Sequence, residues 1–171
     1  DVDGEFNENG QVNNSRPDVV IGAPGANGDT GVVFLYSGQV LRDAFDNGTP
    51  ITIETELSGS VPGEQFGSAV SILPDLTPAA QVKNRDTANV LVFVDSNADI
   101  AVGAPGSGNV YVFFGQPNMP PFLSSSEANL TIPGAEGVSG FGSLVLELFD
   151  VNGDFIDDMG VGGDGSVSIY Y

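Results

Sequence analysis

Hydrophobic residues along the chain come in short runs separated by polar and glycine-containing segments. Residues 19–21, 32–36 and 110–114 are rich in Val, Ile, Phe and Tyr. Short runs of β-branched and aromatic residues bounded by turn residues are typical of strands. No segment has the pattern of a long amphipathic helix. The sequence therefore predicts an all-β fold made of many short strands joined by tight turns.

One pattern recurs along the chain. Phe-Gly-Ser at residues 66–68 returns at residues 141–143, and an aspartate follows each copy at the same spacing, Asp75 and Asp150. Asp1 lies at the matching place of a preceding copy. After each aspartate we expect an Asp-started apolar strand (18–24, 99–105 and 158–163), a Gly-started strand (31–36, 108–114 and 165–171) and, in two copies, an outer strand (51–57 and 129–132).

Each copy thus contains up to four short strands, with a loop between the first two. A four-stranded sheet repeated along a chain is the signature of propeller blades. We predict one β-propeller domain with about three four-stranded blades: residues 1–59 lacking the first strand, residues 60–134, and residues 135–171 lacking the outer strand. A β-sandwich would explain the strands but not the repeated pattern.

Three blades are too few for a closed propeller, which has roughly four to eight. Three explanations remain open: an arc or fragment of a larger propeller, which we favour, sheets completed by other chains in an assembly, or a separate domain with unusual caps. The sequence begins at Asp1, inside a candidate metal loop. We therefore expect the N-terminus of the protein to lie elsewhere.

The loop at residues 150–158 has the pattern of a calcium site. Oxygen-bearing side chains stand at alternate positions, followed by one more at the end of the loop: Asp150, Asn152, Asp154 and Asp158. Calcium takes six to eight oxygen ligands at roughly 2.3–2.6 Å, and alternate residues of a tight loop can all point inward. The alternative is an acidic turn in contact with solvent.

These motifs together resemble the FG-GAP repeat family, which forms the blades of the integrin α-subunit propeller and of many bacterial surface proteins. The resemblance spans nearly the whole chain. It implies a β-propeller with Ca²⁺ in loops that join the first and second strands of blades, in a protein that is extracellular or surface-exposed and serves adhesion or recognition. The matching motifs are Phe66-Gly67, Phe141-Gly142, Gly22-Ala23-Pro24, Gly103-Ala104-Pro105 and the loop at Asp150.

The resemblance also implies a ligand set for the loop at residues 150–158. The side chains of Asp150, Asn152, Asp154 and Asp158 would donate oxygens, and Ile156 would donate its carbonyl. Phe155 stands where the family usually has glycine, which could strain the turn.

The other two loops differ from this one. In the first loop, Asp1, Asp3, Glu5 and Asp18 would form a second site, although a polar insertion at residues 7–17 separates Asp18 from the others. The second loop keeps only its first and last aspartates, Asp75 and Asp99, around a long insertion, and we expect no calcium of the family type there. We therefore expect one or two Ca²⁺ ions, each acting as a structural clamp between two strands.

Composition excludes several classes of function. The net charge is −19, with only four Lys and Arg residues, so the chain should repel nucleic acid and anionic membranes. Bound cations would neutralise part of this charge; the alternative is an acidic surface that favours solubility. The chain has no Cys and no His, which excludes cysteine nucleophiles, Ser-His-Asp triads and zinc sites built from thiolates or imidazoles. No apolar run is long enough to cross a bilayer.

We therefore expect an extracellular or cell-surface module that binds calcium and recognises a protein or glycan. The alternative is a structural subunit of an extracellular assembly or filament, in which neighbouring subunits or further blades are the partners. A third hypothesis is a non-catalytic part of a hydrolase. We expect no enzymatic activity, because every carboxylate cluster is better explained as a calcium loop.

Overall fold

A computed structural model describes residues 2, 17–74, 76, 97–153 and 157–171. Strands dominate these residues, which confirms the all-β prediction. The strands are β1 (Val19–Ala23), β2 (Val32–Tyr36), β3 (Thr55–Ser58), β4 (Ala69–Leu73), β5 (Asp99–Ala104), β6 (Asn109–Phe113), β7 (Phe122–Ser124), β8 (Leu130–Pro133), β9 (Leu144–Phe149), β10 (Asp158–Gly163) and β11 (Ser166–Tyr170).

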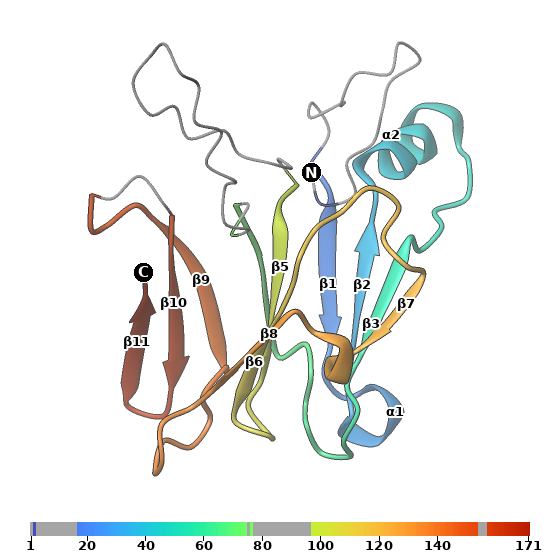
Figure 1. The fold of residues 1–171 in the computed structure, drawn as a ribbon. Coiled ribbons are helices and arrows are strands. Elements are labelled where there is room, and N and C mark those ends of the chain that lie inside the picture. The colour runs from blue at the N-terminus through green and yellow to red at the C-terminus, as the bar shows by residue number, and fades with distance from the viewer. Residues whose placement is uncertain (1, 3–16, 75, 77–96, 154–156) are drawn as a thin grey trace.

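The strands form three separate sheets that stand side by side (Figure 1). The first sheet has the order β1-β2-β3-β7, the second β4-β5-β6-β8, and the third β9-β10-β11. The second sheet lies in the middle, because its strand β4 contacts β1 on one side and β9 on the other. Among the described residues none of the sheets closes on itself.

Strand β7 departs from the predicted division of the chain. The sequence assigns residues 60–134 to the second repeat, yet β7 pairs in parallel with β3 of the first sheet, with Leu57 opposite Leu123. The 3-10 helix η1 (Ser125–Glu127) follows, and the chain then returns to the second sheet as β8. This three-residue strand is too short to leave a periodic pattern in the sequence.

Two short helical segments also occur, α1 (Ala26–Asp29) and α2 (Gly38–Asn47). The hydroxyl of Ser37 caps α2 by accepting from the N–H of Gln39, and Gly48 ends it in the left-handed conformation. The hydrophobic pattern did not predict α2. The predicted outer strand at residues 51–57 also begins later, at Thr55, which pairs with Leu35 near the end of β2.

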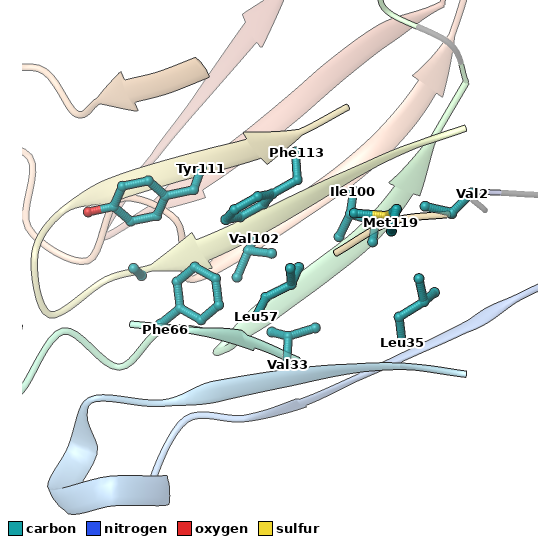
Figure 2. Close-up of a cluster of buried hydrophobic side chains, with 11 residues drawn as sticks. Val2, Val33, Leu35, Leu57, Phe66, Ile100, Val102, Tyr111, Phe113 and Met119 are labelled. Atoms are coloured by element: carbon teal, nitrogen blue, oxygen red, sulfur yellow. The ribbon is translucent and has the colours of Figure 1, made fainter. Parts of the chain in front are cut away.

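The hydrophobic core lies in two layers, one at each interface between sheets. At the first interface, apolar side chains of β2 and β3 face those of β5 and β6, with Phe66 between them (Figure 2). The largest fully buried members are Phe66, Phe113, Leu35, Leu57 and Ile100. The second interface is formed by Leu73, Ala101, Val110, Val112, Phe141, Val145, Met159 and Val161.

Glycines set how closely neighbouring sheets approach. A Cβ atom on Gly22 would lie 2.1 Å from the carbonyl oxygen of Gly67, and one on Gly103 would lie 1.9 Å from that of Gly142. Both distances are far inside van der Waals contact, so any side chain there would push the sheets apart. Gly67 and Gly142, the glycines of the two Phe-Gly motifs, also have φ of +87° and +88°, which favours glycine.

Candidate metal-binding loops

Three aspartates occupy equivalent places, at the start of the second strand of each predicted repeat. Asp18 directly precedes β1, while Asp99 and Asp158 begin β5 and β10. All three carboxylates are buried, with exposed fractions of 6%, 0% and 2%. A buried carboxylate is stable only when hydrogen bonds or a cation compensate its charge, so its partners define its role.

One carboxylate oxygen of each aspartate binds the loop that precedes it. Oδ2 accepts a hydrogen bond from the backbone N–H of Val2 at 2.6 Å in the first loop. The same atom accepts from Leu76 at 2.8 Å in the second loop and from Val151 at 2.8 Å in the third. Each donor directly follows the loop's first aspartate, so the three loops start in the same way.

The other carboxylate oxygen binds the chain just after the third strand of the repeat. Oδ1 of Asp18 accepts from the N–H of Gly38 at 2.9 Å, and Oδ1 of Asp99 accepts from that of Gly115 at 2.9 Å. In the third loop Oδ1 of Asp158 accepts from the side-chain amide of Asn152 at 3.4 Å. In the first two repeats the carboxylate therefore joins the loop, the second strand and the end of the third strand.

These hydrogen bonds give the aspartates a role in folding that needs no cation. Hydrogen bonds to a charged acceptor each contribute roughly 1.5–3 kcal/mol. Asp99 forms the same pair of bonds as Asp18, although the sequence of its loop lacks the other candidate ligands. The family resemblance alone did not reveal this anchoring role, which the aspartates have in addition to any metal binding.

In the third loop three predicted ligands, Asp150, Asn152 and Asp158, lie among the described residues. Oδ1 of Asp150 accepts from the N–H of Gly153 at 2.6 Å, and Gly153 has φ +85°. Asn152 contacts Asp158 directly. The pairing of β9 with β10 is irregular beside Asp158, where the loop leaves the sheet. Asp158 thus contacts Asn152 and the backbone of Val151 at the end of a sheet, and Asp150 binds the backbone of the same loop. Carboxylate and amide oxygens are the ligand type that calcium prefers.

The remaining predicted ligands lie outside the described residues. These are Asp154 and Ile156 in the third loop and Asp1, Asp3 and Glu5 in the first. Within the described part of the chain, no three His, Cys, Asp or Glu side chains gather as a metal site. The calcium sites therefore stay predictions.

The described residues fit a calcium ion chemically. A carboxylate has about four lone-pair sites on its two oxygens. The hydrogen bonds that Asp150 and Asp158 accept from the backbone therefore leave lone pairs for a cation at the same oxygens.

Two acidic residues next to the third loop influence each other. Glu147 on β9 is partly buried, and its pKa is raised by desolvation and by the negative charge of Asp157. Asp157 lies between the predicted ligands Ile156 and Asp158 in the sequence and is partly buried. A cation bound in this loop would lower the repulsion between the two carboxylates.

The sequence did not predict a buried polar cluster around Glu64, which is 1% exposed. Its Oε2 accepts from the N–H of Ser60 at 2.8 Å and from the hydroxyl of Ser125 at 3.3 Å. Its Oε1 accepts from the hydroxyl of Tyr111 at 2.5 Å. Burial and this bond raise the pKa of Tyr111. Glu64 precedes the Phe-Gly motif in a turn-like segment, where a sequence pattern predicts exposure.

Neither a family model nor a curated protein matches this chain. The described helices are too short or too polar to span a membrane.

Proposed function

We propose that the chain is part of an FG-GAP-type β-propeller that binds calcium and serves as an extracellular recognition or adhesion module. The observation that supports this best is the contact of Asn152 with Asp158, with Asp150 in the same loop between the first two strands of a repeat. That is the place where the resemblance expects the ion. Asp154 and the carbonyl of Ile156 would complete the ligand set.

The propeller assignment has its own support. The aspartate hydrogen bonds and the contacts between glycines recur from sheet to sheet. A repeated unit that packs only on its neighbours is what a propeller or a solenoid requires.

The role of the ion in this proposal is structural. Asp150 and Asp158 repel each other when both are charged, and a cation between them converts repulsion into attraction. An ion that binds only the folded state stabilises it by roughly 3–4 kcal/mol at 100–1,000 times its dissociation constant. The first loop, with Asp1, Asp3, Glu5 and Asp18, would hold a second ion in the same way.

The partner in this proposal is a protein or a glycan, bound by loops at the ends of the sheets. Loops on a rigid β scaffold are the usual place for recognition. The strong negative charge argues against nucleic acid as a partner. It also suits a setting rich in calcium, such as the outside of a cell.

The test compares thermal unfolding in millimolar Ca²⁺ with unfolding in excess chelator. We expect calcium to raise the melting temperature by about 10 °C. Asp154→Ala should abolish this rise and leave the melt in chelator unchanged. Asp157→Asn, which removes a neighbouring charge but no predicted ligand, should keep the rise. Identical melts in calcium and chelator would refute calcium binding.

A second candidate function is a structural subunit of an extracellular assembly. It is favoured by apolar side chains left exposed on the third sheet, including Leu144, Val167 and Ile169. Sedimentation in calcium separates the two functions. A recognition module should be a defined monomer or small complex at all concentrations, whereas a subunit of an assembly should polymerise as concentration rises.

A further inference from the structure

One face of the third sheet is apolar, and no part of the chain that the structure describes covers it. Gly160 is paired with Leu146 and Ile169, and Gly162 with Leu144 and Val167, so all of them point to one side of the sheet. The four side chains other than glycine are 44–71% exposed. We call this surface the outward face; it consists of Leu144, Leu146, Gly160, Gly162, Val167 and Ile169.

The second sheet has a face with the same register, and that face is buried. Ala101 is paired with Val112, and Gly103 with Val110. These two pairs are equivalent to the pairs Gly160–Ile169 and Gly162–Val167 of the third sheet. Ala101, Val110 and Val112 are completely buried, in a cluster with Phe141 of the second Phe-Gly motif.

The first sheet repeats this arrangement once more. Gly22 is paired with Val33, and Val20 with Leu35. Val33 and Leu35 are completely buried in a cluster with Phe66 of the first Phe-Gly motif. Two of three equivalent faces are thus covered by the segment that begins with the next Phe-Gly motif, and the third is the outward face.

Gly162 gives a second, independent indication. Its equivalents Gly22 and Gly103 are needed because the carbonyl oxygen of the next Phe-Gly glycine lies where a Cβ would be, at 2.1 Å and 1.9 Å. For a Cβ on Gly162 the three nearest atoms all belong to Leu144 of its own sheet, the closest at 3.0 Å. The third sheet therefore has the glycine that a neighbouring backbone demands, although no such backbone of the described residues lies against it.

We propose that the outward face is a docking surface for the Phe-Gly strand of a further repeat of the same design. The occupant would place its phenylalanine against Val167 and Ile169 and its glycine carbonyl on Gly162. A second copy of this chain fits less well, because Phe66 and Phe141 are already 0% and 2% exposed inside their own interfaces. The inference rests on the propeller assignment of the proposed function and on packing, and a failure of calcium binding would leave it unchanged.

A chain extended in the correct register tests this. The pair Met159–Tyr170 of the third sheet is equivalent to the pair Ile100–Phe113 of the second sheet. Tyr171 is therefore equivalent to Phe114, and the residue after it would be equivalent to Gly115. A copy of residues 115–171 appended after Tyr171 would therefore supply an outer strand and a Phe-Gly strand at the natural spacing. The matched control carries Phe141→Asp and Gly142→Val in the appended copy only.

The readout uses the absence of native cysteine. Val167→Cys introduces a single thiol on the outward face, where the native side chain is 71% exposed. We expect a thiol reagent to label it at least about tenfold more slowly in the extended chain than in the original chain or the control. Val110→Cys, at the equivalent buried position, gives the rate expected for a covered thiol.

Three results would overturn the proposal. The first is fast labelling in the extended chain with the appended repeat folded. The second is an appended repeat that stays unfolded. The second sheet packs on the first and the third on the second, so an equivalent face should support a further repeat. The third is a dimer of the original chain that protects the thiol at position 167, since a second copy would then be the occupant.

Discussion

The second and third sheets share one pattern but differ in what surrounds them. The second sheet is covered on both faces, and β5 is buried at every position. The third sheet is covered on one face only, and β11 has no buried residue. The loops of the two repeats also differ. The loop of the second repeat keeps only its first and last aspartates, whereas the loop of the third repeat keeps the full predicted calcium pattern.

This comparison separates three roles that the repeat combines. The aspartate at the start of the second strand is present in both sheets and forms the same bond to its loop, so it anchors the fold. The residues between the two aspartates vary and would decide whether calcium binds. The central glycine accommodates the backbone of the next sheet where one is present.

The largest expected effect contrasts Gly103→Ala with Gly162→Ala. A methyl group on Gly103 would lie 1.9 Å from the carbonyl oxygen of Gly142, and a backbone atom cannot easily move away. We expect a loss of about 4 kcal/mol or more in the free energy of unfolding, measured with urea. Gly162→Ala meets only Leu144 and should cost less than about 1 kcal/mol. Equal losses would show that close sheet packing does not explain these glycines.

A smaller effect is expected for Asp99→Ala. The substitution leaves the N–H groups of Leu76 and Gly115 without their carboxylate partner, which should cost about 3 kcal/mol, the low end for two hydrogen bonds to a charged acceptor. Urea unfolding should give the same loss in calcium and in chelator. Asp158→Ala should also destabilise the protein in chelator and, in addition, remove the stabilisation by calcium. If Asp99→Ala had no effect in chelator, the anchoring role would be wrong.

The smallest loss of stability is expected for the hydrogen bond between Tyr111 and Glu64 of the second repeat. The equivalent residues of the third repeat are Ser168 and Ser139. The neutral phenol is favoured in the folded state, because burial and Glu64 raise its pKa above the usual 10.0. Its contribution to stability is therefore complete below pH 10 and is lost as the pH rises through the folded-state pKa.

Tyr111→Phe is the matched variant for this test. It should cost about 1 kcal/mol at neutral pH, because it removes the hydrogen bond to Glu64. It should also make the loss of stability above pH 10, measured by urea unfolding, shallower than in the unmodified protein. Parallel pH profiles would show that Tyr111 does not contribute to the alkaline decline.

Much of the fold could be predicted from particular local patterns. The strands around Val19, Val32 and Val110 follow from runs of β-branched and aromatic residues, and the repeat follows from Phe-Gly motifs and aspartates at constant spacing. The candidate site was predictable only as a ligand list, from oxygen-bearing residues such as Asp150 and Asn152 at alternate positions. The hydrogen bonds by which Asp18 and Asp99 anchor the fold could not be predicted, because strand register determines that Gly38 and Gly115 are their partners.

The sequence by itself determined the all-β class, the repeated unit and the positions of its aspartates and glycines, because these depend on residue type and spacing along the chain. The tertiary structure decided that β7 joins the first sheet, that Glu64 is buried among hydroxyl groups, and that one face of the third sheet is uncovered. These features depend on contacts between residues far apart in the chain, and a one-dimensional pattern does not specify such contacts.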